Sequence, residues 1–194
     1  MAYPYWKPKY EKEIDKILTI SPQLKQEAKK LLFDIAKRRN ISSESRKDSI
    51  DYGLSPKRKS NQPTLVGIHV RRGDKVRSGW ILPGKDYFVR AMDHFRAKYK
   101  NVYFVVVSED KNYIKQNIVG ANVLRSTAQS DILEFTLLTL CDHTIMSVGT
   151  FSWWAAYLTG GDVVYYREHM PKTGRLANFH NDSQYFLPEW KPMV

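Results

Sequence analysis

Hydrophobic residues along the chain follow two spacings that alternate from one segment to the next. Short apolar runs predict strands buried on both faces, because only such strands lack a polar side. Between these runs, apolar residues recur every three to four positions, which is typical of amphipathic helices. The predicted strands are residues 64–70, 102–108, a short one around 123, 143–147 and 162–166. The predicted helices between them are residues 85–99, 110–117, 130–141 and 150–158.

This alternation of strands and helices predicts the fold class. Strands separated by helices form right-handed β-α-β units, which build a mostly parallel sheet with helices on both sides. We therefore expect an α/β fold with a Rossmann-like sheet. The chain has 194 residues, the size of one structural domain. Within it we expect residues 1–62, which are helices and a polar loop, to pack on a main part formed by residues 63–194.

The N-terminal part contains two amphipathic helices followed by a polar segment. Apolar residues between Tyr10 and Leu18 define the first helix. Ser21 and Pro22 start the second helix, since proline is favoured in a first helical turn. Residues 40–62 have no hydrophobic period and are rich in Ser, Lys and Asp, which predicts a surface loop.

The first motif with a chemical meaning stands at the end of the strand 64–70. Residues 69–74 read His-Val-Arg-Arg-Gly-Asp, so this strand ends in two adjacent arginines. In open α/β sheets, ligands bind beyond the carboxyl ends of the strands. Arginine is well suited to phosphate because its planar head donates two parallel hydrogen bonds. Arg71 and Arg72 therefore predict a diphosphate site. The alternative interpretation is an exposed basic loop, or an arginine paired with Asp74 for structure.

A second set of motifs helps to decide between a diphosphate site and a structural basic loop. Residues 131–166 contain Leu-Leu-Thr-Leu-Cys and then Gly-Thr-Phe-Ser-Trp-Trp-Ala-Ala-Tyr-Leu-Thr-Gly-Gly-Asp, and residues 186–190 read Phe-Leu-Pro-Glu-Trp. With these motifs in this order, the chain resembles the galactoside α-1,2-fucosyltransferases, glycosyltransferase family 11, over nearly its whole length and most weakly across residues 40–62. The resemblance implies the C-terminal, donor-binding half of a GT-B type enzyme, in which a second domain faces this one across a cleft.

The resemblance also implies a reaction. It is the inverting transfer of L-fucose from GDP-fucose, in α-1,2 linkage, to a terminal β-galactoside of a glycan. The leaving diphosphate gains negative charge, which many glycosyltransferases neutralise with a metal held by an Asp-x-Asp motif that this sequence lacks. Arg71 and Arg72 would supply fixed cations instead, so we expect no metal and no other cofactor. The alternative function is a GDP-sugar-binding domain without turnover.

The residues of the first motif can be given separate roles. Neighbouring side chains of an extended segment point in opposite directions, so we expect one arginine to grip the β-phosphate and the other to brace the loop, with Arg72 favoured for the grip. His69 faces the same side as Arg71 and could bind a phosphate or ribose oxygen, or fix the loop. Asp74 could orient an arginine, the role we favour, or act as the general base. The base could also lie in the other half of the enzyme, or not be a discrete side chain.

Three more residues would complete the nucleotide site. Glu134 stands where the resembling family has a carboxylate, and it would accept hydrogen bonds from the ring N–H and the amino group of guanine; Asp131 is its rival. Thr150 is expected to cap the helix 150–158, and Ser152 to offer its hydroxyl to the same phosphate, because helix N-termini bind anions.

Several conspicuous residues are better explained by structure than by chemistry. Cys141 is expected to be a small buried residue, since one cysteine cannot form an intrachain disulfide. Trp153, Trp154 and Tyr157 are expected in the core, although one tryptophan could line the pocket. The pair Gly160-Gly161 predicts the turn that ends the helix 150–158.

Charge and targeting signals bear on partners and location. The formal net charge of +11 indicates an anionic partner. No helix-turn-helix, zinc-finger or RNP signature is present, so we expect a nucleotide sugar rather than nucleic acid. Asn40 and Asn181 stand in Asn-x-Ser sequons, which predict glycosylation. The sequence has neither a transmembrane run nor a signal peptide. The resemblance implies a lumenal position at the Golgi membrane, through an anchor absent from this chain.

Overall fold

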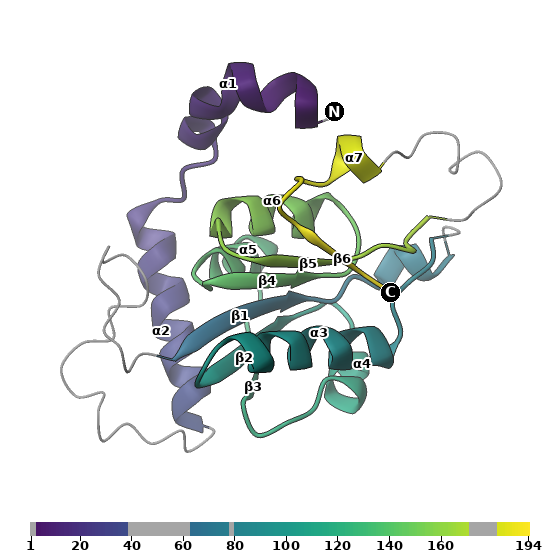
Figure 1. The fold of residues 1–194 in the computed structure, drawn as a ribbon. Helices are drawn as coiled ribbons and strands as arrows, with labels where there is room; N and C mark the ends of the chain where they lie inside the picture. Colours follow the sequence, from purple (N-terminus) through teal and green to yellow (C-terminus); the bar gives the residue numbers. More distant parts are fainter. Residues whose placement is uncertain (1–2, 39–62, 78–79, 171–181) are drawn as a thin grey trace.

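The computed structural model describes residues 3–38, 63–77, 80–170 and 182–194, which form a six-stranded sheet flanked by helices (Figure 1). The strands are β1 (Thr64–His69), β2 (Val102–Val107), β3 (Val123–Arg125), β4 (His143–Met146), β5 (Val163–Tyr166) and β6 (Lys191–Met193). The α-helices are α1 (Tyr3–Ile17), α2 (Pro22–Arg38), α3 (Lys85–Lys98), α4 (Lys111–Asn117), α5 (Asp131–Thr139), α6 (Thr150–Thr159) and α7 (Asp182–Tyr185). A short 3-10 helix spans Gly73–Arg77.

The strands are all parallel and stand in the order β3-β2-β1-β4-β5-β6. The chain builds outward from β1 through β2 to β3, and then crosses back to place β4 on the other side of β1. The strand order therefore reverses between β1 and β4. In doubly wound sheets the carboxyl ends of such a pair are the topological switch point, where ligands bind. The predicted α/β fold with a Rossmann-like parallel sheet is confirmed.

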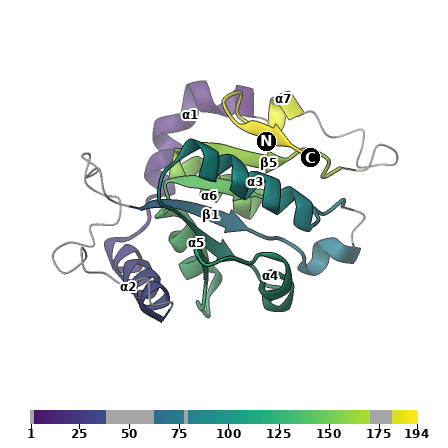
Figure 2. The ribbon, with the colours of Figure 1, turned by 60° about the horizontal axis from the view of Figure 1, so that its bottom comes forward.

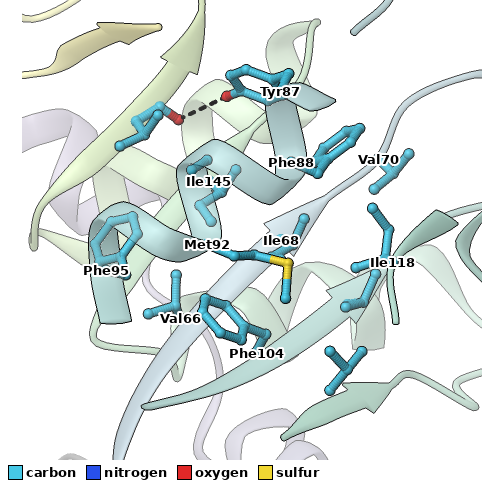
Figure 3. Packing of buried hydrophobic residues seen from close by; sticks show 14 of the residues in the cluster. Val66, Ile68, Val70, Tyr87, Phe88, Met92, Phe95, Phe104, Ile118 and Ile145 are labelled. Carbon is cyan, nitrogen blue, oxygen red and sulfur yellow. Dashed lines mark hydrogen bonds between the residues drawn. The ribbon is translucent and has the colours of Figure 1, made fainter. Parts of the chain in front are cut away.

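Helices cover both faces of the sheet (Figure 2). On one face, Phe88, Met92 and Phe95 of α3 pack over Val66 and Ile68 of β1 (Figure 3). The opposite face is covered by α2, α5 and α6, and its buried residues include Leu32, Leu65, Val105, Leu137, Leu138 and Ala155. Because both faces are buried, most positions of the inner strands are apolar, which explains the near-continuous apolar runs in the sequence.

Four elements differ from the prediction, and among them the helix α7 and the 3-10 helix at Gly73–Arg77 were not predicted. The helix α1 begins at Tyr3, well before Tyr10. The edge strand β6 was not predicted, because it is 3 residues long and contains Pro192, which has no N–H for the ladder. Proline is tolerated at this edge because only one neighbouring strand, β5, needs to be paired. The predicted loop at residues 40–62 lies outside the described residues, so the boundary at residue 62 stays a prediction.

The residues that were expected to be structural lie in the core. Cys141 is buried, and burial raises the pKa of its thiol. Trp153 is buried, and Trp154 and Tyr157 pack against the same hydrophobic cluster. Gly160 ends α6 in the left-handed conformation, with a φ of 70°, as the predicted turn requires. None of the helices in the described part of the chain is long and apolar enough to cross a membrane.

Candidate functional site

The arginine loop, residues 70–73, follows β1 at the switch point and is held by both neighbouring strands. The backbone N–H of Arg71 donates to Ser147 Oγ, just after β4, at 2.8 Å. The backbone N–H of Arg72 donates to Glu109 Oε1, just after β2, at 2.7 Å. Two successive N–H groups are thus anchored to opposite sides of β1, which fixes the path of the loop and with it the directions of the two arginine side chains.

The Arg71 side chain is half-exposed and lies between two carboxylates. Its Nη2 donates to Asp74 Oδ1 at 2.6 Å, and its Nη1 lies 3.6 Å from Glu109 Oε1. The Asp74 side chain is 59% exposed. Ion pairs this close to solvent contribute little to stability, so an anionic ligand can replace one of these carboxylates at small cost. The geometry agrees with the orienting role expected for Asp74, and its role in catalysis stays a prediction.

The Arg72 side chain is packed more firmly. Its guanidinium carbon lies 3.9 Å from the centre of the Tyr113 ring, a cation–π contact. Its Nε lies 3.4 Å from Asp110 Oδ2. Tyr113 and Asp110 both belong to the start of α4, where Asp110 is the N-cap. In this state Arg72 joins the arginine loop to α4, while Arg71 is the more accessible of the two cations.

His69 is buried at the end of β1. Its Nδ1 is hydrogen-bonded to Ser152 Oγ, and its ring centre lies 4.8 Å from that of Phe151. Ser152 Oγ also donates to the Val148 carbonyl oxygen at 3.2 Å, which assigns the shared proton to the imidazole nitrogen Nδ1. Burial, and then the charge of Arg71, lower the pKa of His69 to about 3, so the imidazole is neutral at pH 7. The structure shows His69 tying β1 to α6, and direct binding of a ligand stays a prediction.

The start of α6 corrects one expectation. Gly149, not Thr150, is the N-cap, and it has a φ of 93°, in the region that favours glycine. A glycine cap has no side chain, so the helix begins without a side-chain cap. Ser152 is fully buried, and its hydroxyl is engaged by His69 and Val148. No oxygen of the described residues accepts the backbone N–H of Thr150 or Phe151, as in other uncapped first turns.

Glu134 lies in the first turn of α5 and is buried, whereas its rival Asp131 is exposed. Its Oε1 lies 2.5 Å from Nζ of Lys111, the first residue of α4. Lys111 follows Asp110, the residue that faces Arg72. The arginine loop and Glu134 are therefore connected through the start of α4, along the carboxyl edge of the sheet.

Several partners of the predicted residues were not foreseen. They are Ser147, Glu109, Asp110, Lys111 and Tyr113. All of them follow β2 or β4, so they too lie beyond the carboxyl ends of strands, where ligands bind in open α/β sheets. What the sequence lacked was the strand order, which makes β2 and β4 the two neighbours of β1.

The surroundings add three observations. An apolar cavity of about 330 Å³ lies between α1, α6 and α7 and meets the site only at Thr150. Its lining has no charged residue, so it does not suit a diphosphate. Within the described ranges, no three or more His, Cys, Asp or Glu side chains are grouped so that they could hold a metal ion. The sequons at Asn40 and Asn181 lie outside the described residues.

In doubly wound parallel sheets such as this one, ligands bind at the switch point, where this chain carries two arginines. Residues 2–193 match the family described as Glycosyl transferase family 11, and the chain belongs to this family. The family membership predicted from the motifs is confirmed.

Curated relatives agree with this membership. The chain is 39% identical over 141 residues to the galactoside 2-alpha-L-fucosyltransferase SEC1 of Bos taurus, covering 68% of this chain and 38% of that protein. It is 39% identical over 142 residues to the galactoside alpha-(1,2)-fucosyltransferase 2 of Mus musculus, covering 68% of this chain and 41% of the relative. The matched part of the chain thus covers about two fifths of the length of these relatives.

Among solved structures, the chain is similar to the ADP-heptose lps heptosyltransferase II of E. coli, with a TM-score of 0.49 and 10% identity over 91% of this chain and 44% of that one. The GT-B arrangement of a complete two-domain enzyme stays a prediction for this protein.

Proposed function

We propose that this chain is the donor-binding part of an enzyme that transfers L-fucose from GDP-fucose, with inversion and without a metal, to a terminal β-galactoside in α-1,2 linkage. One observation carries the proposal: Arg71 and Arg72 lie at the switch point of the sheet, and the buried Glu134 lies on the same edge, connected to them through α4. Membership of glycosyl transferase family 11 and the names of the relatives support it.

The arginines supply the positive charge that this reaction needs. As the bond between fucose and the β-phosphate lengthens, negative charge accumulates on the leaving diphosphate, and fixed cations aimed there lower the barrier. Arg71 is half-exposed and its carboxylate partners lie near solvent, whereas Arg72 is stacked on Tyr113. These contacts favour Arg71 for the β-phosphate and Arg72 for bracing, the reverse of the division favoured by the sequence.

The remaining site residues divide between the base and the phosphates of the donor. Glu134 would accept hydrogen bonds from the guanine ring N–H and amino group, with the Lys111 ammonium orienting the carboxylate. The free N–H groups at the start of α6, beginning with Thr150, would face a phosphate. His69 and Ser152 would hold this helix start against β1. Asp74 would orient Arg71, and the general base is assigned to no residue of this chain.

The location follows from the same proposal. We propose the lumenal side of the Golgi membrane. The resemblance to membrane-anchored family members is the support for this placement.

Calorimetric titration tests the proposal. GDP should bind with a clear preference over ADP and over a short oligonucleotide, and the affinity for GDP should survive excess EDTA because the two guanidiniums replace a metal. Equal binding of GDP and ADP, or strict dependence on Mg²⁺ or Mn²⁺, would contradict it. Incubation with GDP-fucose and a β-galactoside then distinguishes an enzyme from a GDP-sugar-binding domain without turnover, since only the enzyme releases GDP and forms the fucosylated product.

A further inference from the structure

Glu109, the second residue after β2, contacts both arginines of the arginine loop. Its Oε1 accepts the backbone N–H of Arg72 at 2.7 Å and lies 3.6 Å from Arg71 Nη1. The shorter contact is with the backbone, so the carboxylate primarily fixes the loop and only secondarily draws the Arg71 guanidinium toward itself. One oxygen thus acts on both arginines.

The loop is shaped to admit this carboxylate. Gly73 has a φ of 24°, and a Cβ built on it would lie 2.8 Å from Glu109 Oε1. Any other residue at position 73 would displace the glutamate or strain the backbone. The glycine of the His-Val-Arg-Arg-Gly-Asp motif is therefore needed for the seat of Glu109 as well as for the turn itself.

The position of Glu109 separates it from the expected ligand. The switch point lies between β1 and β4, and Ser147 after β4 holds Arg71 N–H from that side at 2.8 Å. Glu109 follows β2, on the opposite side of β1. A diphosphate at the switch point would contact the arginine loop on its β4 side. Glu109 contacts the loop on its β2 side, so its carboxylate fixes the loop without occupying the diphosphate site.

We propose that Glu109 is a positioning residue for the donor diphosphate: by accepting the Arg72 N–H and facing Arg71 Nη1, it presents the Arg71 guanidinium to the β-phosphate. This inference rests on the proposed function. The working part of the side chain is one acceptor oxygen at the correct place, and a glutamine can supply it, whereas an alanine cannot.

The test compares GDP with GMP, which lacks the β-phosphate, on folded variants. In Glu109→Ala the affinity for GDP should fall about tenfold, as expected for loss of a hydrogen bond that organises a charged site, while the affinity for GMP changes less than about twofold. Glu109→Gln should stay within about threefold of wild type for GDP. Asp93→Ala is the matched control, because Asp93 also pairs with an arginine, Arg96, but on α3.

The possible results distinguish failure of the proposed diphosphate site from failure of the role proposed for Glu109. If wild type binds GDP no better than GMP, the proposed diphosphate site fails, and the role of Glu109 fails with it. If wild type prefers GDP and Glu109→Ala keeps the same GDP-to-GMP ratio, only the role of Glu109 is wrong. An equal loss for both nucleotides in a folded Glu109→Ala protein leaves that ratio unchanged and would likewise overturn the role of Glu109. Tighter GDP binding in either variant would mean that Glu109 competes with the phosphate, and would overturn the proposal.

Discussion

The two edges of the sheet both carry charged clusters around a buried histidine, but they are built differently. At the amino edge, Asp162 is bound by Lys98 and by the Tyr99 hydroxyl, and its N–H donates to His143 Nδ1 at 3.0 Å. The Tyr99 and His143 rings stack with their centres 4.2 Å apart. Burial alone would raise the pKa of Asp162, but the hydrogen bonds from Lys98 and Tyr99 prevail and lower it. The Asp162 carboxylate and backbone N–H are therefore paired within this cluster.

At the carboxyl edge the cluster is open. Its charged side chains reach solvent, as Lys98 and Asp162 also do at the amino edge, but here the first N–H groups of α6 meet no acceptor among the described residues. Charge therefore does not tell the two edges apart, because both have cations and carboxylates in contact. The difference comes from the topology: helices begin at the carboxyl edge, and the strand order reverses there. A closed cluster holds the fold together, whereas an open one can exchange its partners for a ligand.

The largest expected effect is on the amino edge and on stability. A Cβ on Gly161 would lie 1.8 Å from the backbone oxygen of Asp142, which cannot move aside easily. Gly161→Ala should lower the free energy of unfolding by about 3 kcal/mol or more. Denaturant unfolding measures this, with Gly84→Ala as control, since a Cβ on Gly84 meets nothing within 4 Å. A Gly161→Ala protein as stable as wild type would show that this edge is not closely packed.

The next effect is on the carboxyl edge and on base selection. Glu134→Gln replaces one acceptor oxygen by a donor that would face the guanine N–H or amino group, which costs about 1–3 kcal/mol of GDP binding. The preference for GDP over ADP should shrink, while some binding persists through the phosphate contacts. Titration calorimetry measures both quantities. Asp131→Asn, on the exposed side of the same helix, should change neither the GDP affinity nor the preference for GDP over ADP. If Asp131→Asn alone weakens GDP binding, then Asp131, and not Glu134, contacts the guanine base.

The pH dependence of the unfolding free energy tests the structural role of His69, the buried histidine at the carboxyl edge. The pKa of His69 is about 3 in the folded protein, below its ordinary value of 6.5. The unfolded chain therefore binds the extra proton first, and stability falls as the pH decreases through this window. Between pH 7 and pH 5 this histidine should contribute a loss of about 2 kcal/mol. His69→Gln should reduce the loss by that amount in denaturant unfolding, and an unchanged pH dependence would contradict a buried neutral imidazole.

The sequence predicted the elements and the motif better than the contacts between them. Apolar runs and helical periods depend on neighbouring residues, so all strands except β6 could be read from the chain. The contacts of Glu109 and Ser147 with the arginine loop depend on which strands flank β1, and nothing local in the sequence encodes this. The cap of α6 was misassigned to Thr150 because a hydroxyl residue was preferred over Gly149, whose backbone conformation needs a glycine.

The central claim, that the carboxyl edge and not the amino edge binds the nucleotide sugar, is tested most directly by removing cations from each edge. Arg71→Ala combined with Arg72→Ala removes charge-assisted hydrogen bonds of about 1.5–3 kcal/mol each. GDP affinity measured by calorimetry should therefore fall at least about tenfold, with a thermal melt close to that of wild type. Lys98→Ala, which removes a cation from the amino edge, should leave GDP affinity unchanged. A folded double variant that binds GDP as tightly as wild type would contradict the claim.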